Sequence, residues 1–251
     1  MSALLEVSGL NKHFGGLHAV RNVSFSLEAG EIVGILGPNG AGKTTLYNLL
    51  TGFIPPDSGS VLFKGNSLNR LAPFRIAGLG ISRTFQLCRP FVGMTVFENV
   101  VVGGLGARSE DRAGLDARAL ALLAQVGLAA KAQMPVEALS YGDQRRLEIA
   151  RALAAKPALL LLDEPFAGLG SSEIADLSAL IRSVHAEQGL TVLLIEHKLH
   201  EFMRLVGRVI ALDFGEIIAE GTPEYIVRHP AVVEAYIGRG DEQAEEQTHA
   251  A

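Results

Sequence analysis

Hydrophobic and polar residues follow two spacings along the chain, and together they predict an α/β protein. Residues 22–28 alternate polar with apolar side chains, the period of a half-buried strand, so we expect antiparallel strands over residues 4–30. Other stretches are short and continuously apolar, which is typical of parallel strands buried on both faces. These buried strands are predicted at residues 31–36, 158–162 and 191–195. Shorter strands are predicted at residues 60–64, 81–86, 209–212 and 216–219.

The middle of the chain has a helical character. Between residues 96 and 153 it is rich in alanine and leucine, and glycines interrupt it, which favours several short helices over one long helix. We therefore expect a separate helical lobe over about residues 87–155. Two more short helices are predicted to begin at Pro223 and Pro230, because proline is favoured in the first turn of a helix. Residues 239–251 are polar and predict a disordered tail.

A glycine-rich stretch follows the predicted strand 31–36 and precedes an apolar segment that favours a helix. It reads Gly37, Pro38, Asn39, Gly40, Ala41, Gly42, Lys43, Thr44 and Thr45, and it fits the pattern G-x-x-x-x-G-K-[ST]. Between a strand and a helix, the N–H groups of such a loop converge on a polyphosphate, and glycine permits the close approach and the positive φ. Lys43 would reach the β- and γ-phosphates, and the Thr44 hydroxyl would ligate Mg²⁺. The alternative is a glycine-rich turn that binds no ligand. It is disfavoured because both the residue pattern and its position between a strand and a helix fit a phosphate-binding loop.

Two carboxylates, Asp163 and Glu164, follow the apolar run 158–162. Ligands bind at this end of the strands in parallel α/β sheets. Beside a phosphate loop, Asp163 would hold Mg²⁺ through water and Glu164 would polarise the attacking water; the alternative is a solvated acidic strand end. His197 follows the run 191–195 and would donate to the γ-phosphate if the two strands are neighbours, although a lone histidine there is usually polar surface.

Other residues admit both a structural and a functional role. Phe14 precedes the glycine-rich stretch and, taken alone, favours a core position. Ser140 precedes a helical stretch and favours an ordinary helix cap, although its hydroxyl and the nearby N–H groups would suit an anion. Gln86 ends a predicted strand with an amide. The apolar residues of 88–96 favour either packing inside the helical lobe or a partner-binding surface, and Phe91 is the one we single out.

Composition and charge narrow the class of protein. The 251 residues carry a formal net charge of −5, which weighs against non-specific nucleic-acid binding because that binding needs a basic surface. The longest apolar runs are strand-sized, so no spanning helix is expected, and the first residues lack the features of a signal peptide. Cys88 is the single cysteine, which excludes an internal disulfide and fits a reducing compartment. We expect a cytoplasmic protein unless a partner holds it at a membrane.

Taken together and in order, these motifs over residues 4–238 resemble those of the ATP-binding subunits of ABC transporters. The glycine-rich stretch is similar to Walker A, and residues 160–164 to Walker B with Glu164 as its catalytic glutamate. The further matches are to the Q-loop, the adenine-stacking aromatic, the switch histidine and the L-S-G-G-Q signature, at Gln86, Phe14, His197 and residues 139–143.

The resemblance implies a fold and a mechanism. The fold is a P-loop NTPase core of α/β type with an N-terminal antiparallel β subdomain and a helical subdomain. ATP and Mg²⁺ are the implied cofactors. The implied metal ligands are Thr44, Gln86 and Asp163, and the implied catalytic residues are Glu164, His197 and Gln86. Two subunits would enclose two ATP molecules, each site completed by Ser140 and Gly142 of the other chain.

The resemblance also implies partners. Membrane-spanning permease subunits, a second ATPase subunit and an extracytoplasmic solute-binding protein would complete the system, with no nucleic acid, and the chain would be peripheral on the inner face of the cell membrane. Finer similarity is to the branched-chain amino acid importer ATPases, in residues 83–86, 94–99, 147–151 and 233–238. Residues 164–168 also occur in lipopolysaccharide-export ATPases, so that class stays an alternative.

Some residues depart from the family pattern. Tyr141 replaces the first glycine of the signature and Asp143 its glutamine, and Gly170 stands where an acid or amide is expected. A negative Asp143 is unfavourable near a γ-phosphate unless it points away or serves the helix dipole. Two rival classes remain: a soluble ABC ATPase acting on nucleic acid or ribosomes, which usually carries insertions or tandem cassettes, and a P-loop kinase, which needs neither Ser140 nor His197.

Overall fold

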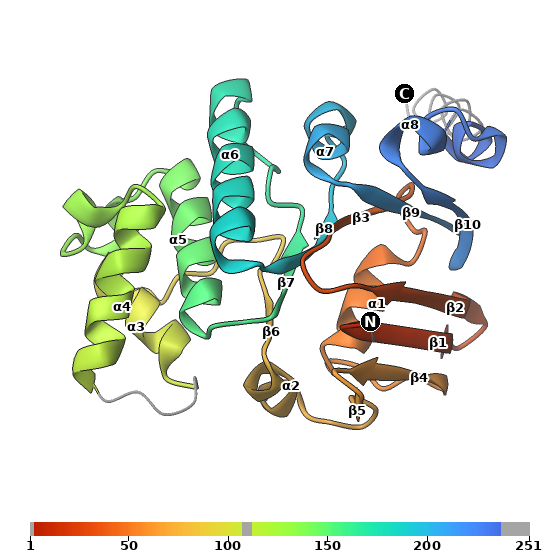
Figure 1. Cartoon of the computed structure of the whole chain (residues 1–251), viewed down its shortest axis with the longest axis horizontal. Helices are drawn as coiled ribbons and strands as arrows, with labels where there is room; N and C mark the ends of the chain where they lie inside the picture. The colour runs from red at the N-terminus through yellow and green to blue at the C-terminus, as the bar shows by residue number, and fades with distance from the viewer. Residues whose placement is uncertain (1–2, 107–111, 237–251) are drawn as a thin grey trace, which may run out of the picture.

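The computed structural model describes residues 3–106 and 112–236, and it contains a small and a large β-sheet with helices around them (Figure 1). The small sheet has the strand order β2-β1-β4-β5, and its neighbours are antiparallel. Its strands are β1 (Leu5–Phe14), β2 (Leu17–Leu27), β4 (Ser58–Phe63) and β5 (Asn66–Ser67). The predicted antiparallel strands within residues 4–30 are confirmed, whereas the predicted tail lies outside the described residues.

The large sheet has the strand order β10-β9-β3-β8-β7-β6. It is parallel from β9 to β6, and β10 joins its edge antiparallel. Its strands are β3 (Ile32–Leu36), β6 (Ile81–Arg83), β7 (Leu159–Asp163), β8 (Thr191–Ile195), β9 (Arg208–Asp213) and β10 (Glu216–Gly221). Each continuously apolar run is therefore a parallel strand, as the pattern predicts.

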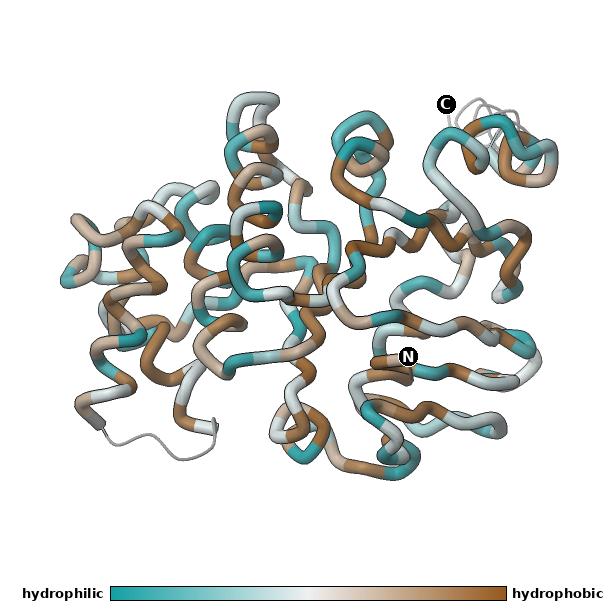
Figure 2. The backbone as a smooth tube through the Cα atoms, viewed as in Figure 1, coloured by the Kyte–Doolittle hydropathy of each residue, from teal (hydrophilic) through white to brown (hydrophobic). Residues whose placement is uncertain are grey.

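The large sheet separates two hydrophobic clusters. Along β7, Leu160 and Leu162 belong to one cluster, and Leu159 and Leu161 to the other. Because successive side chains point to opposite faces, a strand covered on both faces has no polar position, which explains the unbroken apolar runs. Figure 2 shows hydrophobic residues gathered along these central strands.

Helices α3, α4 and α5 pack together in a lobe beside the large sheet (Figure 1). They span Val96–Gly104, Arg112–Gln125 and Tyr141–Ala154, with 3₁₀ turns at Ala129–Lys131 and Val136–Ala138. The prediction of several short helices in this region is confirmed. Further helices are α1 (Lys43–Leu50), α2 (Pro73–Leu79), α6 (Ser171–Gln188), α7 (Leu199–Leu205) and α8 (Pro223–Ile226), and the backbone is also helical over residues 230–236, so the helices predicted to begin at Pro223 and Pro230 are confirmed. Within the described part of the chain, none of the helices has the length and apolar character that a membrane crossing requires.

The predicted strand 81–86 is wrong in its length, because β6 ends three residues before Gln86. The chain leaves the sheet at Phe85, whose N–H donates to the carboxylate of Glu148 on α5 at 3.0 Å instead of to the neighbouring strand. Burial raises the pKa of Glu148, and the Phe85 N–H and the nearby Arg145 charge oppose that rise. Gln86 therefore lies on a loop held between the large sheet and the helical lobe, and not at a strand end.

Gly34, in the middle of β3, has no room for a side chain. A Cβ built there would lie 2.2 Å from Cζ of Phe202, which is fully buried. We expect Gly34→Ala to lower the free energy of unfolding by about 1–3 kcal/mol, because overpacking a closed core forces strain. Thermal unfolding measures this as a lower Tm. Gly78→Ala in α2 is the matched control, since nothing lies within 4 Å of its Cβ position, and equal Tm values for the two variants would contradict the packing.

Candidate functional site

A cavity of about 370 Å³ lies where the small sheet, the glycine-rich loop and the ends of β7 and β8 meet. Its lining includes Phe14, residues 39–45, Gln86, Glu164 and His197. These residues come from distant parts of the sequence. The fold therefore brings most of the predicted site residues to one cavity.

The glycine-rich loop forms one wall of this cavity. Gly40 and Gly42 have φ values of 79° and 100°, and a Cβ on Gly42 would lie 2.5 Å from a backbone carbonyl oxygen of β2, so only glycine fits there. The Lys43 ammonium donates to the carbonyl oxygens of Gly37 at 2.5 Å and Pro38 at 2.9 Å. Helix α1 begins at Lys43, so the N–H groups of its first turn lie at the cavity, where they favour an anion.

Glu164 lies between two polar side chains that the sequence also singles out. Its Oε1 is 2.6 Å from Nε2 of His197, and its Oε2 accepts a hydrogen bond of 2.8 Å from Nε2 of Gln86. Strands β7 and β8 are neighbours, which is what brings Glu164 and His197 together. Glu164 has φ 49°, a conformation that costs free energy for a residue with a Cβ, and its N–H is tied to the carbonyl oxygen of Ile195 at 2.9 Å.

Glu196, for which the sequence predicted no role, holds the backbone around this pair. It is 1% exposed, and its Oε1 accepts from the N–H of Phe166 at 2.5 Å. Its Oε2 accepts from the N–H groups of His197 at 2.8 Å and Lys198 at 3.1 Å. A buried charge needs such compensation, and here the compensation fixes the two loops that carry Glu164 and His197. An acid directly after a buried strand was the available sequence signal.

Asp163 lies behind the cavity wall rather than on it. It is 3% exposed, and its Oδ2 accepts from Nη2 of Arg83 at 2.7 Å. Thr44 and Gln86 line the cavity, so the three predicted metal ligands offer a hydroxyl, an amide carbonyl and a carboxylate. These oxygen donors fit Mg²⁺, which keeps much of its water and uses only one or two protein carboxylates.

Comparison with known proteins identifies the family. The family model described as ABC transporter matches residues 20–167, which include the glycine-rich loop, Gln86 and Glu164. The chain belongs to the ABC transporter family. A second model, described as Branched-chain amino acid ATP-binding cassette transporter, matches residues 216–242. The protein is accordingly an ATP-binding subunit of an ABC transporter and hydrolyses ATP, as the sequence predicts.

Relatives and solved structures support the assignment over nearly the whole chain. The high-affinity branched-chain amino acid transport ATP-binding protein LivG of Escherichia coli K12 is 43% identical over 249 residues, 94% of this chain and 98% of LivG. The ADP conformation of MJ1267, an ATP-binding cassette of an ABC transporter, has a TM-score of 0.86 at 31% identity, covering 95% of this chain and all of that one. The dimeric post-hydrolysis state of the cassette MJ0796, bound to ADP and Pi, has a TM-score of 0.78 at 28% identity, covering 87% of this chain and 98% of that one. The predicted fold class is confirmed.

Ser140 and Gly142 do not line the nucleotide cavity of this ABC ATPase. Ser140 caps α5, where its Oγ accepts from the N–H of Asp143 at 3.2 Å. Gly142 faces Glu173 at the start of α6, and a Cβ on Gly142 would lie 2.4 Å from that carboxylate. Both residues border a separate small hollow. The structure therefore does not bring these two predicted site residues to the cavity that holds the glycine-rich loop.

Each of the three residues that depart from the ABC family pattern contacts another side chain of this protein. Asp143 forms an ion pair with Lys131, so its negative charge is compensated within the helical lobe. The hydroxyl of Tyr141 accepts from Nη2 of Arg145 at 2.7 Å. Gly170 caps α6, where its N–H donates to Glu173 at 3.0 Å.

The cavity of the ABC ATPase has further lining residues that the sequence did not indicate. They are Leu17, His18, Ala19, Arg21 and Phe214. The hairpin β9–β10 reaches this place because the N–H of Arg21 donates to the carbonyl oxygen of Gly215 at 2.8 Å. Desolvation and the charges of His13 and Arg21 lower the pKa of His18 from its ordinary value. The β1–β2 hairpin places four of these side chains close to Phe14 in sequence, whereas only a tertiary contact brings Phe214 to the cavity.

Proposed function

We propose that this ABC ATPase binds ATP with Mg²⁺ in the cavity and uses hydrolysis to drive import of branched-chain or other hydrophobic amino acids through separate permease subunits. The observation that carries the chemistry is the Glu164 carboxylate, held by both Gln86 and His197 at the wall of the phosphate-loop cavity. The solute class rests on the similarity to LivG and on the match of residues 216–242 to the branched-chain amino acid model.

Different residues at the cavity bind the nucleotide, hold the metal ion and activate the water. Phe14 stacks on the adenine, and the N–H groups of residues 39–45 together with Lys43 bind the phosphates. Glu164 accepts a hydrogen bond from the attacking water and aligns it with the γ-phosphate. Nε2 of His197 orients Glu164 through their 2.6 Å contact, and with ATP bound the same ring would donate an N–H to the γ-phosphate in place of that contact. Thr44, Asp163 and Gln86 would hold Mg²⁺, which would offset the charge that develops between the phosphates.

The active form is a dimer with a second ATPase subunit. Ser140 and Gly142 lie outside the cavity of their own chain, and Ser140 and the N-terminal N–H groups of α5 form a surface suited to an anion. The pairing of Asp143 with Lys131 removes the charge conflict at that surface. Each ATP is thus bound by the phosphate loop of one chain and by Ser140 and Gly142 of the other.

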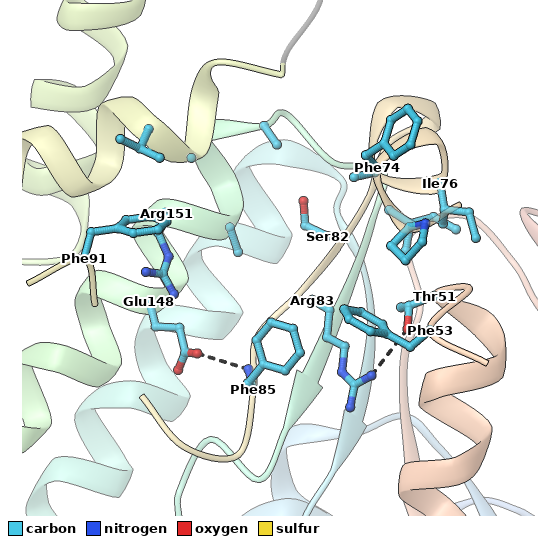
Figure 3. Close-up of a pocket in the computed structure, with 17 residues that line it drawn as sticks. Thr51, Phe53, Phe74, Ile76, Ser82, Arg83, Phe85, Phe91, Glu148 and Arg151 are labelled. Atoms are coloured by element: carbon cyan, nitrogen blue, oxygen red, sulfur yellow. Dashed lines mark hydrogen bonds between the residues drawn. The ribbon is translucent and has the colours of Figure 1, made fainter. Parts of the chain in front are cut away.

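A second hollow, of about 430 Å³, is the docking groove for a permease subunit. It lies between α2 and the helical lobe, away from the phosphate loop, and Figure 3 shows the side chains around it. Its exposed aromatic residues, 39–73% accessible, are Phe53, Phe74, Phe85 and Phe91. Apolar side chains exposed in a hollow favour an apolar partner segment, and a short helix of the permease fits this shape. Gln86 follows Phe85 directly, so the groove adjoins the catalytic loop.

The proposed docking gives a testable role to Phe91. We expect Phe91→Asp to reduce permease-stimulated ATPase at least about tenfold, while basal turnover changes by less than about threefold because Phe91 does not line the cavity. Val92→Asp is the matched control, since Val92 is 76% exposed and does not line the groove. Steady-state ATPase assays with and without the copurified permease measure both effects. An equal loss in the two variants, or a lower Tm of Phe91→Asp alone, would mark Phe91 as part of the lobe's own core.

The complete system places this subunit on the inner face of the cell membrane, with permease subunits and an extracytoplasmic solute-binding protein. Tagged protein purified from detergent-solubilised membranes should carry permease subunits with it. Proteoliposomes of that complex, loaded with MgATP, should accumulate radiolabelled leucine, isoleucine or valine in competition with one another. Copurification with ribosomes, or uptake of none of these amino acids, would overturn the proposed function.

A further inference from the structure

Arg83, on β6, connects the docking groove with the carboxylate of Asp163. Its guanidinium donates to Oδ2 of Asp163 at 2.7 Å, and the two side chains are 7% and 5% exposed. Arg83 also lines the groove (Figure 3). A single buried side chain therefore touches both a proposed metal ligand and a proposed partner surface.

The same guanidinium is bonded to the helix that follows the phosphate loop. Its Nη1 donates to Oδ1 of Asn48 at 2.7 Å and to Oγ1 of Thr51 at 3.3 Å, and both acceptors lie in or just after α1. Helix α1 begins at Lys43. Arg83 therefore fixes the distance between the strand that carries Asp163 and the helix that carries the phosphate-binding residues. The planar fork of arginine allows both bonds at once, which a lysine ammonium at the same place does not.

Three aromatic rings surround the guanidinium, and two of them, Phe53 and Phe85, line the groove. Its Cζ lies 5.4 Å from the ring centroid of Tyr47, 5.9 Å from that of Phe53 and 5.1 Å from that of Phe85. Tyr47 is fully buried, whereas Phe53 and Phe85 are 53% and 39% exposed and meet edge to face at 5.8 Å. A segment seated in the groove would press on these two rings. Because cation–π contacts depend on ring position, moving the rings changes what holds Arg83.

We propose that Arg83 is a positioning residue that transmits occupancy of the groove to Asp163 and to α1. The inference rests on the proposed roles of Asp163 and of the groove. A permease helix displaces Phe53 and Phe85, the guanidinium follows them, and the carboxylate and the phosphate-loop helix shift with it.

The first test replaces Arg83 without changing its charge. In Arg83→Lys we expect the half-saturating Mn²⁺ concentration to rise about tenfold, the lower end of the range for residues that orient metal ligands. Electron paramagnetic resonance of free Mn²⁺ measures this with ATP bound to the Glu164→Gln chain, so the readout does not need turnover. Arg182→Lys is the control. Arg182 lies on α6, and the bond described for it is to the carbonyl oxygen of Arg204 on α7. A shift below twofold in Arg83→Lys would overturn the proposal.

The second test asks whether the groove acts through Arg83. Phe53→Leu should raise the half-saturating Mn²⁺ concentration about threefold, although Phe53 lines the groove and not the nucleotide cavity. In the Arg83→Lys background the same change should add less than about 1.5-fold, because the connection is already broken. Tyr225→Leu, with a similar exposure of 52% on α8, controls for loss of a surface aromatic. Equal effects of Phe53→Leu in both backgrounds would contradict transmission through Arg83.

The third test uses the complex with copurified permease subunits. Arg83→Lys should keep the yield of copurified permease within about twofold while the ratio of permease-stimulated to basal ATPase falls at least about fivefold. An unchanged ratio would overturn the inference. Two further variants test the proposed function separately. If Lys43→Ala and Asp163→Asn bind ATP and Mn²⁺ like the unaltered chain, the cavity itself is wrongly assigned. If these two variants lose binding while the effects of Arg83→Lys and Phe53→Leu are additive, only the transmission through Arg83 is refuted.

Discussion

Glu164→Gln should lower ATP turnover by roughly 10²–10³-fold while ATP still binds, because the amide keeps the size of the side chain but removes the base. The structure adds a reason for a large effect. The Glu164 carboxylate accepts from Gln86 and lies 2.6 Å from Nε2 of His197, and an amide cannot accept at both positions. The variant therefore loses the base, and it keeps its contact with His197 only where the imidazole Nε2 accepts from the amide.

Single-turnover hydrolysis and nucleotide binding by a fluorescent ATP analogue separate the two effects. Glu224→Gln is the matched control, since Glu224 is an exposed acid in the first turn of α8, remote from the cavity lining. Its turnover should match that of the unaltered chain. If Glu164→Gln hydrolyses ATP at the unaltered rate, Glu164 is not the base and the water must be activated by another group.

Ser140→Arg should abolish the ATP-dependent dimer and with it at least about 99% of the hydrolysis, since each site needs donors from the other chain. Ser140 is exposed at the start of α5, away from its own chain's cavity, so ATP binding by the single chain should survive. The effect arises from a bulky cation at a surface that must close over the γ-phosphate. Light scattering with ATP, in the Glu164→Gln background that prevents hydrolysis, measures the dimer directly.

Two controls accompany the Ser140 variant. Ser140→Ala removes only the cap of α5, with a cost of about 1 kcal/mol in folding free energy, and it should weaken the dimer far less than arginine does. Ser183→Arg adds the same charge on an exposed part of α6 and should leave the dimer intact. A chain that stays monomeric with ATP even before substitution, alone or with a related ATPase, would refute the shared site for this protein.

Local sequence was sufficient where the physical cause is local. The apolar runs of β3, β7 and β8 predict buried parallel strands because both faces of the sheet are covered. The glycine-rich loop predicts phosphate binding because backbone conformation and the following helix are encoded in adjacent residues. Glu164 and His197 were predicted together only on the condition that their strands are neighbours, and the pairing of β7 with β8 meets that condition.

Other features were predicted wrongly or not at all, because the residue that determines each of them is not a neighbour in the sequence. Strand β6 stops early because Glu148, on α5, takes the N–H of Phe85. The charge of Asp143 conflicts with a phosphate site only until Lys131 is placed beside it. Neither partner is recognisable from the spacing of residues, since each contact depends on how the helical lobe packs.

The sequence by itself predicted the chemistry of this ABC ATPase: its phosphate loop and its two acids lie in stretches whose residue types indicate a polyphosphate with Mg²⁺, whereas Ser140 taken alone favours a helix cap. Tertiary structure alone decided how these parts are connected. Arg83 is a single arginine in an ordinary strand until the fold surrounds it with Asp163, Asn48 and the groove aromatics. Because a buried ion pair is specified by the elements that enclose it and not by its neighbours in the chain, residue spacing could not reveal it.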